Sequence, residues 1–270
     1  MPADRPAEAG TARDGTSPWA RRVRAIVVLT GAGISTDSGI PDFRGPQGVW
    51  TKNPAAEKQS TYQAYMADAE VRRRSWQARL AHPAWSAEPN PAHRALARLA
   101  RSAINTQVIT QNIDELHQRA GTPLERVIEL HGTMFGVVCT GCGTRTAMAD
   151  ALERVRAGEA DPPCESCGGI LKSATVMFGQ PLQSGVYERA AGAAASCDLF
   201  LAIGSTLIVE PAASLCGIAA EAGASLVIIN RDPTPYDHAA TAVIRDPIGQ
   251  AVPRLVDQLM AASRALRGKR

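Results

Sequence analysis

The chain has 270 residues, 45% of them hydrophobic, which is enough to bury a sizeable core as one large α/β domain or as one domain with an insert. Its net charge of +3 is small, so nothing in the composition calls for a nucleic-acid partner. No apolar run is long enough to span a bilayer, and residues 1–20 lack the apolar segment of a secretory signal. We therefore expect a soluble, cytoplasmic protein without a membrane partner.

The first organised stretch follows a tail at 1–20, which is predicted to be disordered because it is rich in Ala, Gly, Pro and charge without periodicity. The apolar run 25–29 then breaks into glycines at 31 and 33, a pattern typical of a buried parallel strand that opens onto a phosphate-binding turn. Glycine lets a diphosphate approach backbone N–H groups closely. Thr36 stands where the dinucleotide fingerprint has its third glycine, so the two glycines alone are weak evidence.

The next stretch, 39–50, is too rich in Gly and Pro for a helix and too apolar for an idle linker, which indicates a mobile loop. It carries an acid and a base, Asp42 and Arg44, which could simply form a surface ion pair. Spacing further along the chain predicts one or two helices within 55–80 and an amphipathic helix over 92–101, separated by prolines.

Two polar motifs are expected at the carboxyl ends of strands. A short β-rich segment, 107–110, runs into Gln-Asn-Ile-Asp at 111–114, with helical spacing that continues to Ala120. This run could be a capped helix start, although capping explains one polar residue and not three. A second strand, 127–130, ends at His131. An isolated histidine is commonly structural, but a strand end gives it the reach that a general base needs.

Four of the six cysteines form two C-x-x-C pairs, Cys139 with Cys142 and Cys164 with Cys167. In a reducing compartment this arrangement indicates one tetrahedral Zn2+ ion, and four thiolates leave no open position, so the metal would be structural. The alternative is two reduced turns without metal. Segment 140–146 offers Arg145 as its single basic residue, which argues against nucleic-acid binding by this zinc-ribbon inset.

Strand-like and helix-like segments alternate again after the inset, with a strand at 198–203, a helix at 212–222, a strand at 226–229 and a closing helix near 252–265. This rhythm predicts an α/β fold with a doubly wound, Rossmann-like parallel sheet and ligands at the carboxyl ends of its strands. The expected organisation is a discontinuous main domain over 21–136 and 177–265 and a smaller zinc-binding inset at 137–176, with part of 50–90 forming a small helical module.

Several motifs together resemble one family. Gly-Ala-Gly-Ile-Ser at 31–35, Gly-Ile-Pro-Asp-Phe-Arg at 39–44, Gln-Asn-Ile-Asp at 111–114 and Leu-His-Gly at 130–132 are similar to the signature of bacterial-type sirtuins, which are NAD-dependent protein lysine deacylases. The resemblance covers about residues 20–262. It implies that the main domain binds NAD and that the acyl group of a substrate lysine passes to ADP-ribose. Nicotinamide and O-acyl-ADP-ribose would then be released.

The resemblance also implies roles for single residues. His131 would be the general base on the nicotinamide ribose, and Asn112, the second catalytic residue, would help Asp114 to hold that ribose and the nicotinamide amide. The 39–50 loop would cover the cofactor, with Phe43 shielding the reactive sugar carbon. The whole set of NAD-binding residues implied by the resemblance is Gly31, Ala32, Gly33, Ser35, Asp42, Phe43, Arg44, Gln111, Asn112, Asp114, Gly204, Ser205, Thr206, Asn230, Arg231 and Ile248.

The sequence departs from the family pattern at two places. Gln180 replaces the glutamate of Phe-Gly-Glu in the strand that pairs with the substrate peptide; pairing through main-chain groups is expected to persist. The acyl-pocket candidates are Trp76 and Arg79, which resemble the Tyr-x-x-Arg that selects acidic acyl groups but carry tryptophan in place of tyrosine. Arg79 either pairs with a succinyl or malonyl carboxylate or is an exposed helical arginine.

Two other functions remain open from the sequence. One is ADP-ribosyl transfer to protein, which uses the same NAD pocket, and the other is a non-catalytic NAD-responsive or zinc-ribbon binding protein. An intact His131 and substrate loop favour deacylation of acyl-lysine proteins or peptides over ADP-ribosyl transfer. A non-catalytic protein would predict a lost base or a broken 111–114 motif, and neither is seen. We expect a monomer because the sequence shows no symmetric apolar patch.

Overall fold

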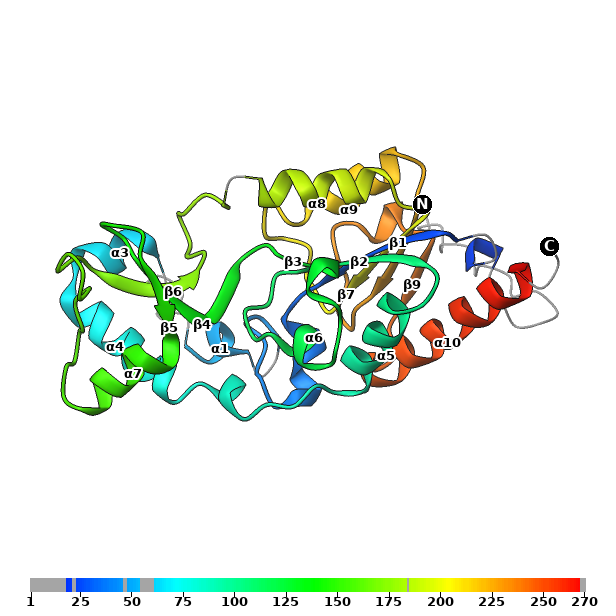
Figure 1. The fold of residues 1–270 in the computed structure, drawn as a ribbon. Helices are drawn as coiled ribbons and strands as arrows, with labels where there is room; N and C mark the ends of the chain where they lie inside the picture. Colours follow the sequence, from blue (N-terminus) through cyan, green and yellow to red (C-terminus); the bar gives the residue numbers. More distant parts are fainter. Residues whose placement is uncertain (1–17, 21–22, 46–47, 54–60, 184, 268–270) are drawn as a thin grey trace.

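The computed structural model describes residues 18–20, 23–45, 48–53, 61–183 and 185–267 (Figure 1). Two sheets organise them, a six-stranded sheet in the order β3-β2-β1-β7-β8-β9 and a three-stranded sheet in the order β5-β4-β6. Most of the tail expected at 1–20 lies outside the described residues. Both sheets and the helices around them agree with the expected α/β fold with a doubly wound sheet and a smaller inset.

The large sheet is parallel throughout. Its central strands are buried on both faces, as their continuous apolar sequences predict. The chain moves outward from β1 to β2 and β3 in one direction and later from β7 to β9 in the other, so the carboxyl ends of β1 and β7 form the switch point where such sheets bind ligands. The strands are β1 (Ala25–Thr30), β2 (Asn105–Thr110), β3 (Val127–Glu129), β7 (Leu199–Ile203), β8 (Ser225–Ile229) and β9 (Ala242–Ile244).

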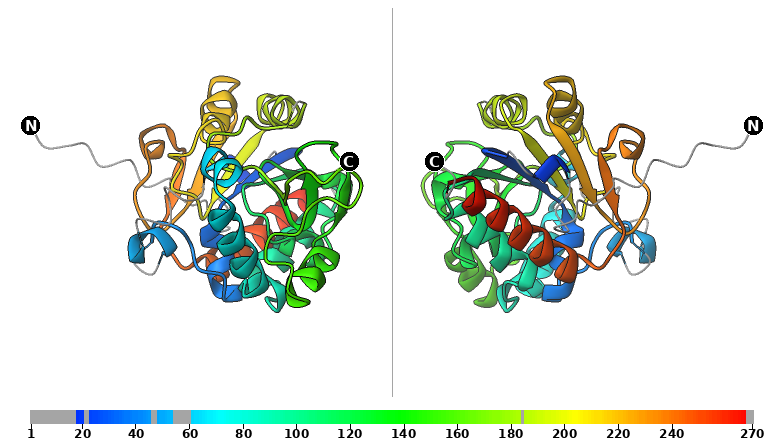
Figure 2. Two further views of the ribbon diagram at one scale, coloured as in Figure 1. Left: turned by 90° about the vertical axis from the view of Figure 1, so that its left-hand side faces the viewer. Right: turned by 90° about the vertical axis from the view of Figure 1, so that its right-hand side faces the viewer.

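Helices cover both faces of this sheet (Figure 2). On one face α5 (Pro91–Ala100) and α10 (Ile248–Arg267) pack over alternate residues of β1, including Ile26 and Val28. On the other face α8 (Val186–Ala195) and α9 (Ser214–Glu221) pack over Val27 and Leu29. Shorter helical elements connect the strands: η1 (Pro18–Ala20), η2 (Ala32–Ser38), α6 (Leu116–Arg119), η4 (Leu124–Arg126) and η5 (Asp237–Ala239). None of the helices in the described part of the chain is both long and apolar enough to cross a membrane.

The small module joins two segments that are far apart in the sequence (Figure 1). Its apolar core brings Trp76 together with Val137, Met148 and Leu171. β6 is an edge strand, and Lys172 donates hydrogen bonds from Nζ to the Ser173 and Thr175 carbonyls of its own strand. The elements are α1 (Val49–Lys52), α3 (Tyr62–Ala67), α4 (Ala69–Leu80), η3 (Pro83–Trp85), β4 (Gly132–Cys139), β5 (Arg145–Ala147), α7 (Met148–Arg156) and β6 (Leu171–Thr175).

Some element boundaries differ from the sequence predictions. The helical spacing that begins at Gln111 becomes a helix only at α6, because the polar residues at 111–114 bond to neighbouring loops. Glu115 adopts a left-handed conformation with φ 54° just before that helix. The last helix begins at Ile248, ahead of the predicted 252, and tolerates Pro253 near its start. β9 and α8 were not predicted, since the first is three residues long and the second is largely alanine.

Candidate functional site

The loops after β1 and β7 pack against each other through three glycines. Gly31 N–H donates to the Ile203 carbonyl at 3.0 Å, and Gly33 N–H donates to the Gly204 carbonyl at 2.9 Å. A Cβ atom on Gly33 would lie 2.9 Å from Gly204 Cα, and Gly204 itself has a φ of 64°. The sequence predicts that these glycines let a diphosphate approach the backbone. The structure shows that they are also required for the contact between the two loops.

The Gln-Asn-Ile-Asp motif is tied to both of these loops. Gln111 Nε2 donates to Ser205 Oγ at 3.0 Å. Asn112 Nδ2 donates to the Gly31 carbonyl and to Ser35 Oγ, both at 3.1 Å. Ser35 Oγ in turn donates to Asp114 Oδ2 at 2.7 Å. The structure thus brings residues from the 31–35, 111–114 and 204–206 segments to one edge of the sheet.

Asp114 is buried beneath this edge. Burial raises the pKa of its carboxyl, while hydrogen bonds from the Leu116 N–H and the Ser35 hydroxyl oppose that shift. Because both carboxyl oxygens accept hydrogen bonds from the protein, Asp114 fixes the position of Ser35 and of the start of α6.

His131 lies between β3 and β4 with a defined tautomer. Its Nδ1 lies 2.8 Å from the Gln111 carbonyl, and since a carbonyl can only accept, Nδ1 carries the proton and Nε2 carries the lone pair. Burial lowers the pKa of His131 below its ordinary value, against the smaller opposing effect of the bond to Gln111. At neutral pH the imidazole is therefore neutral, as a general base requires.

The 39–45 part of the loop is held by the side chain and the backbone of Asp42. Asp42 Oδ1 accepts from the Gly45 N–H at 2.9 Å, and the Asp42 carbonyl accepts from the Val49 N–H at 2.9 Å. Phe43 is 44% exposed on this loop.

The remaining NAD candidates lie at the ends of β8 and β9. Asn230 Nδ2 donates to the Asp232 carbonyl at 2.8 Å, and Arg231 forms an exposed ion pair with Asp232 at 2.7 Å. Ile248 begins α10 and packs against the main core.

The four cysteines form a cluster in the small module. Their Sγ atoms all lie within 4.8 Å of one another, and the Sγ atoms of Cys139 and Cys167 are 3.5 Å apart. Zinc–sulfur bonds of about 2.3 Å in a tetrahedron require sulfur atoms about 3.8 Å apart. Gly169 leaves room for the thiolates, because a Cβ there would lie 3.1 Å from two of them. The donor set fits a structural zinc ion.

Comparisons with known proteins agree with this geometry. The chain matches the model of the Sir2 family over residues 31–211. It is 55% identical over 231 residues to NAD-dependent protein deacetylase 2 of Streptomyces coelicolor, covering 86% of this chain and 96% of the relative. It is 45% identical over 235 residues to NAD-dependent protein deacetylase 1 of Pyrobaculum aerophilum, covering 86% and 89%. The chain belongs to the Sir2 family.

Solved Sir2 structures show the same fold. A Sir2 variant with a deacetylated peptide and 3'-O-acetyl ADP ribose matches with a TM-score of 0.80 and 34% identity, over 90% of this chain and 95% of that one. A Sir2 homologue in complex with ADP ribose matches with a TM-score of 0.81 and 32% identity, over 91% and 96%. The resemblance to sirtuins read from the motifs is therefore confirmed.

In this Sir2 protein, Phe178 lies in the segment expected to pair with a peptide, and Ile208 is a second exposed apolar side chain. Phe178 is 38% exposed after β6, and Ile208 is 60% exposed after β7. The Phe178 carbonyl accepts from the Tyr62 N–H at 2.9 Å, which anchors the 178–180 segment. Gln180 Oε1 accepts from the Met177 N–H at 3.0 Å, so the glutamine that replaces the family glutamate stabilises the turn of its own segment.

The two acyl-pocket candidates lie in the small module. Trp76 is 1% exposed within its core. Arg79 Nη2 donates to Ser173 Oγ at 3.2 Å, and the Arg79 carbonyl accepts from Trp85 Nε1 at 2.7 Å. Trp76 therefore has almost no surface to offer an acyl group, and the Arg79 guanidinium is engaged with β6.

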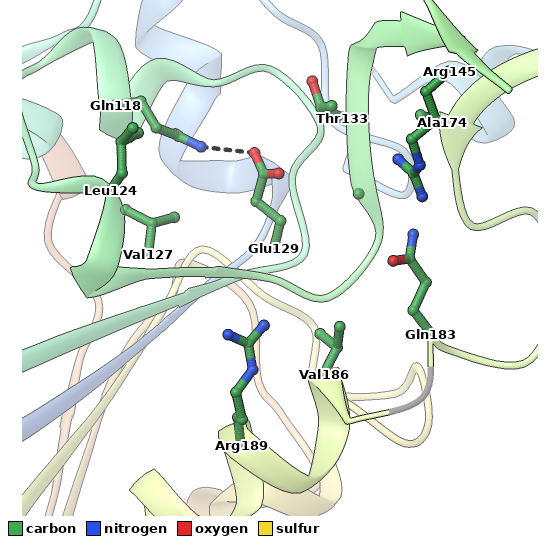
Figure 3. A pocket seen from close by; sticks show the side chains of 11 residues that line it. Gln118, Leu124, Val127, Glu129, Thr133, Arg145, Ala174, Gln183, Val186 and Arg189 are labelled. Atoms are coloured by element: carbon green, nitrogen blue, oxygen red, sulfur yellow. Dashed lines mark hydrogen bonds between the residues drawn. The ribbon is translucent and has the colours of Figure 1, made fainter. Parts of the chain in front are cut away.

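A cavity of about 290 Å3 lies between α8, β3 and the small module (Figure 3). Gln118 and Glu129, joined by a hydrogen bond of 2.7 Å, line it together with Arg189 of α8. None of the residues assigned to NAD lines this cavity. It is therefore distinct from the sheet edge described above.

A buried polar group beneath the site could not be predicted from any motif in the sequence. Thr30 and Thr110 are the last residues of β1 and β2, and Thr30 Oγ1 donates to Thr110 Oγ1 at 2.9 Å. His117, from α6, lies 3.0 Å from the same Thr30 oxygen. The signal that could have found the two threonines is a threonine at the carboxyl end of each strand, directly after buried apolar residues.

Proposed function

We propose that this protein is an NAD-dependent protein lysine deacetylase that moves the acyl group from lysine to ADP-ribose and releases nicotinamide and O-acyl-ADP-ribose. The observation that carries the proposal is His131, a neutral imidazole whose Nδ1 proton is held by the Gln111 carbonyl, leaving Nε2 free to act as a base at the sheet edge. The relatives named NAD-dependent protein deacetylase support it.

The chain's own residues suit a reaction in which NAD is a substrate. His131 Nε2 would accept a proton from a ribose hydroxyl, and the carbonyl of Gln111 would keep the imidazole oriented during that transfer. Asn112 and Asp114 would hold the nicotinamide ribose and amide. Phe43, exposed on its loop, would exclude water from the reacting sugar carbon, which favours capture by the tethered acyl group.

The binding of NAD is proposed along the carboxyl edge from the loop after β1 to the loop after β8. The 31–35 and 204–206 segments would contact the phosphates and the adenosine, Asn230 and Arg231 the adenine ribose, and Ile248 the adenine. The 42–44 segment would close over the cofactor. The close packing of the two glycine loops supports this placement, because it fixes the position of the backbone N–H groups that a diphosphate would approach.

The substrate is proposed to be an acyl-lysine protein or peptide that adds as a strand between Phe178 and Ile208. The acyl preference is proposed to be acetyl, because Trp76 is buried and the Arg79 guanidinium already donates to Ser173.

The four cysteines would hold one structural zinc ion that ties β4 to the segment before β6. We further propose the domain division into 21–136 with 177–265, and 137–176 with part of 50–90. We also propose that the protein is a monomer, that it is located in the cytoplasm and that it has no nucleic-acid partner.

The test is nicotinamide release from NAD with peptides that carry acetyl-, succinyl- or long-chain acyl-lysine. Wild type is expected to act on at least one peptide, and His131→Ala is expected to abolish that activity. His238→Ala, which removes an exposed histidine in η5, is the matched control and should retain activity. Silence across the panel with NAD still bound would contradict deacylation and favour ADP-ribosyl transfer or NAD sensing.

A further inference from the structure

Two fully buried histidines lie behind the site, and the chemistry above uses neither. His93 on α5 is 0% exposed and His117 on α6 is 1% exposed. Their ring centroids are 5.0 Å apart, and the ring planes meet at 65°. A pair of imidazoles buried at this separation requires an explanation, because each ring carries one donor and one acceptor that must be satisfied.

The hydrogen bonds around each ring define its tautomer. Thr30 uses its hydroxyl proton to bond Thr110 Oγ1, so Thr30 Oγ1 accepts from His117 and the His117 proton is on Nε2. The Asn90 N–H donates to His93 Nδ1, so the His93 proton is also on Nε2. The other nitrogen of His117, Nδ1, therefore carries a lone pair.

The two atoms that remain are complementary. His93 Nε2 and His117 Nδ1 are both buried, and neither has a hydrogen-bond partner among the residues that the structure describes. The first is a donor and the second an acceptor. Pairing these two atoms, directly or through one buried water, would remove the free-energy cost of two unpaired polar groups.

From His117 the hydrogen bonds continue to a residue of the proposed active site. Thr30 Oγ1 donates to Thr110 Oγ1 at 2.9 Å, and Thr110 Oγ1 also accepts from the Asn112 N–H at 3.1 Å. From His93 the hydrogen bonds continue to the glycine loop after β1 (31–35). Asn90 caps α5, and its Nδ2 donates to the Ile34 carbonyl at 2.7 Å. The two histidines thus lie between the 31–35 loop and the 111–114 segment, which meet where Asn112 bonds to Ser35.

We propose that His93 and His117 are hydrogen-bonded to each other and act as positioning residues, holding Asn112 in register with the glycine loop through Thr30 and Thr110. This inference rests on the proposed function. Burial lowers the pKa of His93 to about 2 and that of His117 to about 4, in keeping with the neutral tautomers that the bonds require. Neither the two histidines nor Thr30 and Thr110 are among the residues proposed to contact NAD or the peptide, so they would act through Asn112.

The test uses threonine variants, because Thr30→Val keeps the shape of the side chain and removes only the hydroxyl. Thr106→Val is the matched control, since Thr106 is equally buried in β2 but donates to the Ile104 carbonyl near the other end of the strand. Thr30→Val is expected to lower kcat/KM for NAD by about tenfold or more through displacement of Asn112. Thr106→Val should leave kcat/KM within about twofold of wild type, and Thr30→Ser should restore it.

The histidines are tested by the double-mutant cycle of His93→Leu and His117→Leu. The losses in kcat/KM are expected to be strongly non-additive, because either change breaks the same pair. His117→Gln, which keeps an N–H for Thr30, should recover part of the activity. Additive losses, or equal effects of Thr30→Val and Thr106→Val, would overturn the inference; the threonine comparison also decides the matter if the leucine variants do not fold.

Failure of the inference is separable from failure of the proposed function. If wild type releases no nicotinamide, the proposed function fails. The pairing of His93 with His117 is then tested by 15N NMR of the full chain, which reports the protonation of each ring nitrogen. Both rings are expected as the Nε2–H tautomer, with the His93 Nε2 proton protected from exchange with water and exposed to exchange in His117→Gln. An Nδ1–H tautomer at either ring, or an unprotected His93 proton in wild type, would refute the pairing.

Discussion

Replacing Gly33 with alanine tests whether the packing of the two glycine loops sets the NAD site. The new Cβ would lie 2.9 Å from both the Cα and the carbonyl oxygen of Gly204. Carbon atoms in contact are ordinarily about 3.5–4.0 Å apart, so the loops must separate by about 0.6–1 Å. Neither neighbour can move like a flexible side chain, because both are backbone atoms.

The size of the effect follows from this displacement. Overpacking of this kind costs about 1–3 kcal/mol, and the hydrogen bond of 2.9 Å from Gly33 N–H to the Gly204 carbonyl is lengthened. For a chain of this length, Tm falls by about 2–4 °C for each kcal/mol of lost stability. We therefore expect Gly33→Ala to lower Tm by about 6 °C. Asn112 is bonded to the adjacent Gly31 carbonyl, so KM for NAD should rise by about tenfold.

The matched control is Gly192→Ala, in the middle of α8. No described atom lies within 4 Å of a Cβ built there, and alanine is the better helix former by about 1 kcal/mol, so Tm should rise by about 3 °C with unchanged kinetics. The assays are thermal unfolding followed by circular dichroism and nicotinamide release at varied NAD. A Gly33→Ala protein with the wild-type Tm and wild-type KM would refute the steric argument.

Three further predictions use other parts of the site. Because burial lowers the pKa of His131 and the base acts when neutral, kcat/KM for NAD should rise with pH through a midpoint below about 6.5 and then stay level; a midpoint above 7 contradicts the assigned environment. Cys164→Ser should lose bound zinc, measured by atomic emission, and unfold at a lower temperature than wild type; full zinc retention would exclude the four-thiolate site. Arg79→Ala, which removes a donor to Ser173, should lower Tm but leave the ratio of acetyl- to succinyl-peptide turnover unchanged, and selective loss of succinyl turnover would instead make Arg79 an acyl-selecting residue.

Much of the architecture could be predicted from the sequence because it depends on neighbours along the chain. The apolar strands, the glycines that follow them and the paired cysteines act over a few residues, and the structure confirms the doubly wound sheet and the clustered thiolates. His131 was singled out for the same reason, since its place at the end of a strand is a local property.

Only the tertiary structure decided which distant groups meet. That Gly33 faces Gly204, and that His117 lies against Thr30, depends on the order of strands in the sheet. The late start of α6 has the same origin, because hydrogen bonds to other loops outweigh the local helical preference of the residues after Gln111. A sequence pattern encodes burial and local backbone preference, whereas the partner of each buried polar group is chosen by packing across the whole fold.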